Sequence, residues 1–90
     1  MDAGERHPKL ARGCKLRTRE DGDYLLMPES MLRMNRTGCE ILKRCDGAHT
    51  VEQIVAELQT VYAEVEVEKL NAEVDSFLAR LKERLAIIEV

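Results

Sequence analysis

The residue types most often used in catalysis are few in this chain. It contains two histidines, His7 and His49, among 90 residues. His7 stands beside a proline and His49 lies in a polar segment between two apolar stretches, so neither has an evident serine, cysteine or carboxylate arrangement for nucleophilic chemistry. We therefore expect both histidines to be exposed to solvent. We predict no catalytic residue and expect that the chain is not an enzyme.

Metal and cofactor chemistry finds equally little support. Cys14, Cys39 and Cys45 follow no CxxC spacing, and with two histidines they form no recognised set of zinc ligands. The five glycines are isolated, so there is no glycine-rich phosphate loop. We therefore expect no metal and no cofactor. An odd number of cysteines fits reduced, buried thiols better than a disulfide framework.

No segment directs the chain to a membrane or out of the cell. The longest uncharged apolar runs are far shorter than the roughly 20 residues that span a bilayer. The charged N-terminal segment also lacks an apolar stretch of signal-peptide length. The sequence therefore predicts a cytoplasmic protein without a membrane partner.

Three short strands are predicted first along the chain. Residues 14–19 alternate between apolar or small and basic side chains, which is typical of a half-exposed strand. Residues 20–23 form a polar turn containing glycine, and the apolar residues 24–27 complete a hairpin. Pro28 ends that strand because it has no N–H to donate. Residues 31–34 alternate again and are predicted to form a short third strand.

Three helices are predicted after the strands. The first covers residues 38–45, and either Asn35 or Thr37 can cap its N-terminus. Thr50 begins the second helix, with a glutamine at the capping-box position. Apolar residues at helical spacing predict the third helix over residues 70–84.

The predicted order of elements defines the fold class. A chain of 90 residues accommodates a single core. We predict a flexible N-terminal arm over residues 1–11 and one domain over residues 12–90, with a β-prone tail at residues 86–90. A three-stranded antiparallel sheet followed by a three-helix bundle, an α+β winged-helix-like domain, buries the apolar faces of all these elements in one core.

Winged-helix domains also bind DNA, but the charge distribution of this chain disfavours that function. Residues 1–45 hold ten Lys and Arg against seven Asp and Glu, for a net charge of +3, and residues 46–90 hold four against ten, for −6. Between Glu64 and Glu73, at the start of the third helix, four glutamates face one lysine. DNA phosphates would repel such a helix. We predict no nucleic-acid partner and keep DNA binding as the less favoured alternative.

Segments covering nearly the whole chain resemble a known family through their order and spacing. The family is that of pyrroloquinoline quinone (PQQ) biosynthesis protein D, whose fold is the recognition element for precursor peptides of ribosomally made, modified products. The resemblance is carried by Pro8–Gly13, Leu25–Glu29, Asn35–Leu42, Cys45–Gly47, Thr50–Ile54 and Leu70–Leu81.

The resemblance implies a peptide chaperone without chemistry of its own. Such a protein binds the small precursor peptide (PqqA-like) and presents it to a radical S-adenosylmethionine (SAM) enzyme (PqqE-like), which carries the iron–sulfur clusters. The peptide is expected to add as a strand beside the third strand, in a groove shared with the last helix. A recognition element of another modified-peptide pathway and a dimerising structural module are the alternatives.

This binding mode selects eight candidate peptide-binding residues. An edge strand offers unpaired N–H and C=O groups that a peptide strand can satisfy, and methionine gives an adaptable apolar lining. The third strand contributes Met31, Leu32, Arg33 and Met34, and the last helix contributes Leu70, Glu73, Phe77 and Arg80.

Individual roles for these residues follow from charge and periodicity. Arg33 can pair with an acidic side chain of the peptide. At least one of Leu32 and Met34 is expected in the core, because they alternate with Met31 and Arg33. Phe77 and Leu81 lie on an apolar stripe and are expected in the core more than in the groove. Leu70, Glu73 and Arg80 are expected to border the groove. An open edge strand can also pair with a second copy, so the chain is predicted to be a monomer or a weak homodimer.

Overall fold

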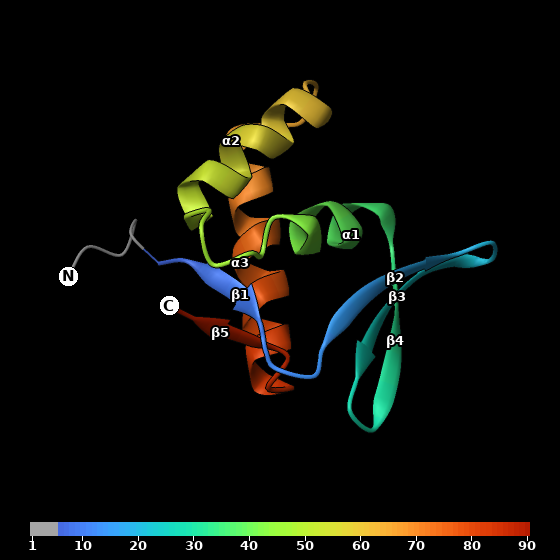
Figure 1. Cartoon of the computed structure of the whole chain (residues 1–90). Helices are drawn as coiled ribbons and strands as arrows, with labels where there is room; N and C mark the ends of the chain where they lie inside the picture. Colours follow the sequence, from blue (N-terminus) through green and yellow to red (C-terminus); the bar gives the residue numbers. More distant parts are fainter. Residues whose placement is uncertain (1–5) are drawn as a thin grey trace.

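Two antiparallel sheets and three helices make up the fold, which a computed structural model describes for residues 6–90 (Figure 1). No helix within these residues combines the length and the apolar character needed to cross a membrane. The elements in chain order are β1 (Pro8–Leu10), β2 (Lys15–Arg19), β3 (Gly22–Met27), β4 (Ser30–Met34), α1 (Arg36–Lys43), α2 (Val51–Val61), α3 (Val67–Glu83) and β5 (Ile87–Glu89).

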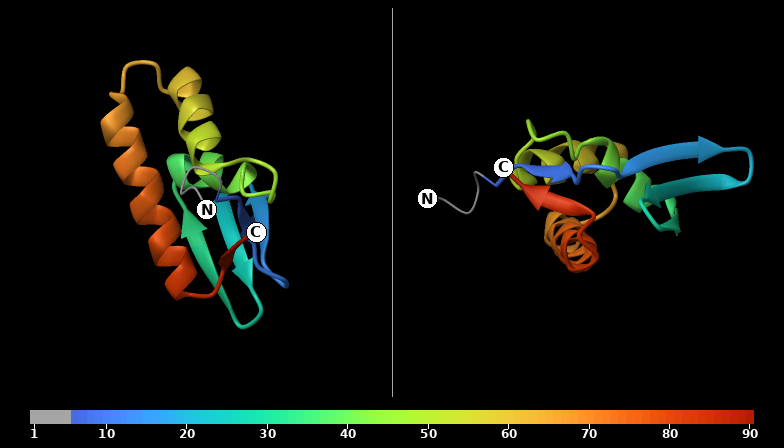
Figure 2. Two further views of the ribbon diagram at one scale, coloured as in Figure 1. Left: turned by 90° about the vertical axis from the view of Figure 1, so that its left-hand side faces the viewer. Right: turned by 60° about the horizontal axis from the view of Figure 1, so that its bottom comes forward.

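The larger sheet has the order β2-β3-β4 and confirms the three predicted strands. Each connection is a two-residue turn, because Arg19 pairs with Gly22 and Met27 pairs with Ser30. Leu25 on the central strand is fully buried against the helices. The far end of the β2–β3 hairpin extends away from the helices as a wing (Figures 1 and 2). The predicted α+β winged-helix-like fold is confirmed.

Local capping explains where the helices begin. The Asn35 side chain accepts a hydrogen bond from the Gly38 N–H at 2.7 Å, so α1 starts at Arg36, before the predicted residue 38. Thr50 and Gln53 form the predicted capping box at the start of α2. The third helix also begins earlier than predicted, at Val67. Residues 67–69 are exposed, so the apolar stripe that predicted this helix starts only at Leu70.

The prediction of a flexible arm over residues 1–11 is wrong for residues 6–11, the part of the arm that the structure describes. Pro8–Leu10 form β1, which pairs with β5, and the Leu10 N–H donates to the Cys45 carbonyl at 3.2 Å. The buried side chains of Ala86 and Ile87 draw the C-terminal tail against the core, and its backbone then needs a partner strand. Residues 1–5 of the predicted arm lie outside the described residues.

The two histidines are half-buried, contrary to the expected exposure. His49 lies between two carboxylates, with Nδ1 2.9 Å from Asp46 and Nε2 2.8 Å from Glu57. Glu57 also accepts a hydrogen bond from Arg44 at 2.8 Å, so this cluster connects the end of α1 to α2. His7 Nδ1 lies 3.2 Å from the Val90 carbonyl. Cys39 and Cys45 are buried free thiols, whereas Cys14 is half-buried, contrary to the expected burial of all three.

The His49 cluster predicts a pH-dependent contribution to stability. Partial burial disfavours the charged ring, but hydrogen bonds to Asp46 and Glu57 outweigh it, so the pKa of His49 is raised. Because the folded pKa exceeds the unfolded value of about 6.5, this contribution is fully present below that pH and is lost as the pH rises through the folded pKa.

We therefore expect His49→Ala to lower the free energy of unfolding more at about pH 6 than at about pH 8. Urea unfolding of the parent and the variant at both pH values measures the difference. An equal loss at the two pH values would contradict this role of the imidazolium.

Candidate functional site

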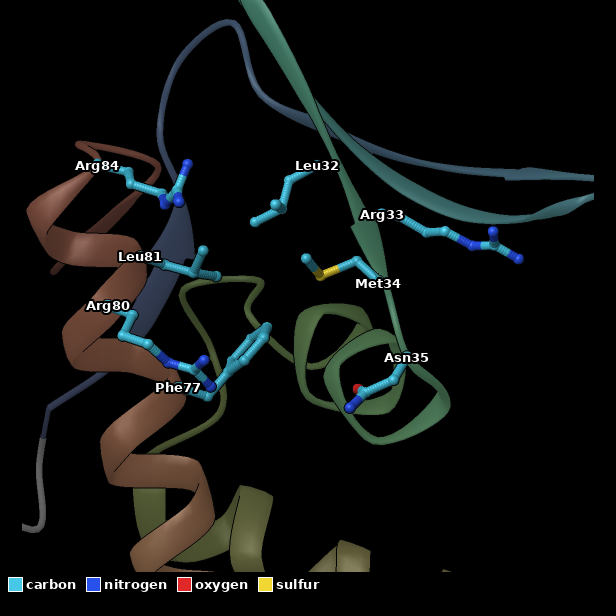
Figure 3. Close-up of a pocket in the computed structure, with 8 residues that line it drawn as sticks. All are labelled: Leu32, Arg33, Met34, Asn35, Phe77, Arg80, Leu81 and Arg84. Atoms are coloured by element: carbon cyan, nitrogen blue, oxygen red, sulfur yellow. The ribbon is translucent and has the colours of Figure 1, made fainter.

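A cavity of about 290 Å³ separates β4 from the C-terminal half of α3. The side chains of Leu32, Met34, Phe77 and Leu81 point into it from opposite walls (Figure 3). The cavity is lined by Leu32, Arg33, Met34, Asn35, Phe77, Arg80, Leu81 and Arg84. The apolar side chains form its floor, while the arginines of α3 stand at its rim.

A second cavity of about 420 Å³ continues the first toward the start of α1. The two share Asn35, Phe77 and Arg80, so together they form one groove along α3. We call this the α3 groove. The second cavity is also lined by Thr37, Gly38, Ile41, Lys69, Ala72, Glu73 and Ser76.

The outer edge of β4 borders the first cavity and has no strand partner among residues 6–90. Residues of an antiparallel pair alternate between those bonded across the ladder and those whose N–H and C=O point outward. Counting from the Met27–Ser30 pair that closes the two-residue turn, Met31 and Arg33 are the outward-facing residues of this edge. The edge therefore presents their backbone donors and acceptors to an added strand.

Gly38 fixes how closely α1 approaches the groove. A Cβ atom at this position would lie 2.9 Å from Cε1 of Phe77 and 3.1 Å from Oδ1 of Asn35. Glycine thus lets the Phe77 ring lie against the first turn of α1, where the ring separates the two cavities. Phe77 is half-buried and contacts the core as well.

The structure brings six of the eight predicted site residues to the α3 groove. They are Leu32, Arg33, Met34, Glu73, Phe77 and Arg80. Met31 lines neither cavity and is 54% exposed, although its backbone belongs to the open edge.

The prediction that Leu70 borders the groove is wrong. Its side chain is 2% exposed and packs in the core with Val74, Leu78 and Leu81. Another face of α3 carries Glu73, Phe77, Arg80 and Arg84. These residues are three or four positions apart, and because about 3.6 residues complete a helical turn, they lie on the same side of the helix.

The side chain of Arg33 is directed away from the groove. Its Nη2 donates to the Asp21 carbonyl at 2.8 Å, and Figure 3 shows the side chain extending toward the β2–β3 hairpin. Arg33 therefore borders the cavity only close to the strand. Because the guanidinium group of Arg33 is held at the hairpin, the structure does not support its expected pairing with a peptide carboxylate. Such a pairing would need another cation.

Sequence reasoning missed Asn35, Leu81 and Arg84 as residues that line the groove. Arg84 stands four residues after Arg80 and seven after Phe77, so helical spacing from either one would have found it. Leu81 was expected in the core, and it is both buried and part of the cavity wall. Arg80 lies over the Phe77 ring, with its guanidinium carbon 6.0 Å from the ring centroid.

The fold and this groove define a small winged-helix-like domain that can accept a strand at its edge. The chain belongs to the family of coenzyme PQQ synthesis protein D (PqqD), whose sequence profile matches residues 24–87. Residues of β4, α1 and α3 that form the groove all lie within the matched region.

Relatives within the family are described as PqqA binding proteins. That of Stutzerimonas stutzeri is 33% identical over 82 residues, covering 89% of this chain and 87% of the relative. That of Pseudomonas aeruginosa (strain UCBPP-PA14) is 40% identical over 60 residues, covering 64% of this chain and 65% of the relative.

A solved structure has the same fold. It is the solution NMR structure of the PqqD truncation of Methylobacterium extorquens PqqCD, described as a functional, stand-alone recognition element for ribosomally synthesized and post-translationally modified peptides (RiPPs). Its TM-score is 0.80 at 28% identity, with 98% of this chain and 94% of that chain covered.

Removing the Phe77 ring should lower the cost of a substitution at Gly38. In the parent, Gly38→Ala should destabilise the fold by about 1 kcal/mol or more, because the methyl group overlaps the Phe77 ring. In a Phe77→Ala background that overlap is absent, so the same change should cost less. The 3.1 Å approach of the new Cβ atom to Oδ1 of Asn35 remains and offsets the gain from alanine's higher helix propensity.

Urea unfolding of the parent, both single variants and the double variant gives this cycle. Equal destabilisation by Gly38→Ala in both backgrounds would show that the Phe77 ring is not what restricts position 38.

Proposed function

We propose that this protein binds the precursor peptide of PQQ biosynthesis and presents it to a radical SAM enzyme. The observation that carries the proposal is the open edge of β4 beside the α3 groove. The relatives described as PqqA binding proteins and the RiPP recognition element with the same fold support the choice of ligand. The proposal assigns no reaction to this chain and places it in the cytoplasm, where its three free thiols would stay reduced.

Peptide binding would use two kinds of contact. Outward N–H and C=O groups of Met31 and Arg33 would pair with the peptide backbone, which extends the sheet by one strand. Alternate peptide side chains would enter the groove, where Leu32, Phe77 and Leu81 provide apolar contacts. Burial of one large apolar side chain there would contribute about 2 kcal/mol.

Bound in this way, the peptide would remain accessible to an enzyme. A strand on an edge contacts the protein through one side of its backbone and through every second side chain. The other side and the segments beyond the groove would stay free. We propose that the radical SAM enzyme acts on those segments while the recognition element holds the rest.

Isothermal titration with the PqqA peptide of Stutzerimonas stutzeri tests the proposal. We expect saturable binding with a dissociation constant of about 10 μM or lower, which corresponds to a binding free energy of about 7 kcal/mol. No heat of binding at about 100 μM peptide would contradict the proposed function.

Backbone pairing at β4 is tested by proline substitution at the edge. Met31→Pro removes an outward N–H without removing a ladder hydrogen bond, so the affinity for the peptide should fall about tenfold or more while the melting temperature changes little. Thr18→Pro is the matched control, because Thr18 is also an outward-facing residue, on the opposite edge strand β2. Equal losses of affinity in the two variants would mean that the peptide does not pair with β4.

A further inference from the structure

We propose that Arg80 and Arg84 make this protein selective for an acidic segment of its peptide. Their guanidinium groups would pair with a carboxylate two residues away from the apolar side chain that enters the groove. The inference rests on the proposed function and specifies the class of peptide that the α3 groove accepts.

The charge around the first cavity is opposite in sign to that of the whole chain. The net charge of the protein is −3, yet the side chains that line this cavity include three arginines and no Asp or Glu. Arg33 is turned toward Asp21, which leaves Arg80 and Arg84 as the cations at the rim. Both side chains are exposed.

Arg80 and Arg84 have no carboxylate partner within residues 6–90, and among the cations without one, such as Arg17 on β2, these two border the first cavity with their side chains at its rim (Figure 3). Lys82, on the other side of the same helix, donates to Glu89 at 2.6 Å. Arg44 donates to both Glu40 and Glu57. Those cations are neutralised within the fold, whereas the two at the groove remain able to bind an external anion.

Basic residues are favourable near any helix C-terminus, because they compensate the partial negative charge of the last carbonyl groups. That effect accounts for a positive charge in the last turn of α3 but is indifferent to which face carries it. Arg80 and Arg84 lie on the face that carries Phe77 and lines the cavity. Their position is therefore explained better by a ligand in the groove than by the helix dipole alone.

The spacing between Phe77 and the two arginines brackets the repeat of a bound strand. Along the helix axis Arg80 lies about 4.5 Å and Arg84 about 10.5 Å beyond Phe77. Side chains on one face of an extended peptide recur every two residues, about 6.6–6.8 Å apart. Since β4 and α3 lie side by side (Figure 2), a strand added to β4 with an apolar residue at Phe77 would place an acidic residue, two positions along, between Arg80 and Arg84, within reach of both long side chains. A guanidinium can bind that carboxylate with two parallel hydrogen bonds.

Titrations with variants on both sides of the interface test the inference. The probe is the PqqA peptide of Stutzerimonas stutzeri, as itself and with each Asp or Glu changed in turn to its amide. The protein variants are Arg80→Gln, Arg84→Gln and the double variant, each checked by thermal melting. Arg80→Lys keeps the positive charge without the guanidinium group, so it tests whether charge alone is sufficient for binding the carboxylate. Arg17→Gln is the control for net charge, because Arg17 is exposed on β2 and lines neither cavity.

We expect each single glutamine variant to weaken binding about 3- to 10-fold, and one amide substitution in the peptide to do the same. That amide substitution should cause no further loss with the double variant, because the carboxylate then has no partner. Arg17→Gln should bind like the parent. The weakening by added salt should be smaller for the double variant than for the parent.

Three results would overturn the inference, and they are distinguishable. If the parent binds the peptide and the arginine variants bind it equally well, the selectivity is wrong while the proposed function stands. If the parent binds none of the peptides, both fail together. Additive losses from the peptide and protein substitutions would also overturn the inference, because independent effects are not a pairing.

Discussion

The outward-facing backbone groups of β4 have no strand partner in the part of the chain that the structure describes, and the other elements hold this edge at a fixed position beside α3. A buried donor or acceptor without a partner is costly, so such an edge must stay hydrated or receive a strand. One residue, Asn35, joins β4 to α1 and caps that helix through Gly38. The same glycine admits the Phe77 ring, so the strand, α1 and α3 are linked at one point.

The last helix serves the core and the groove with different faces. Leu70, Val74, Leu78 and Leu81 are buried and anchor the helix. Behind it, β5 pairs with β1 and secures the C-terminal end, while Lys82 donates to Glu89 of β5. These contacts leave the remaining face free for ligand recognition, and its polar residues need not contribute to folding. Under the proposed binding mode, substitutions on that face would alter which peptide is bound without loss of the fold.

Features set by local sequence were predictable, whereas those set by distant contacts were not. Alternation and the Thr50 capping box correctly predicted β4 and α2, and the resemblance pointed to the wall formed by Phe77 and Arg80. Strand β1 escaped prediction because three residues carry no periodic signal, and they become a strand only by pairing with β5 at the other end of the chain. The phase of α3 was misjudged at Leu70, since an apolar residue near a helix start fits either face. The direction of Arg33 depends on the hairpin turn at Asp21, which sequence spacing does not show.

Hydrogen exchange of individual backbone amides, followed by NMR with and without the PqqA peptide of Stutzerimonas stutzeri, tests the central claim most directly. If the peptide adds as a strand to β4, the amides of Met31 and Arg33 should exchange much more slowly at saturation. Those of Leu32 and Met34, already bonded to β3 by the alternation of the ladder, should change little. A saturating peptide that leaves Met31 and Arg33 unprotected, or that instead protects Leu16 and Thr18 on β2, would contradict the account.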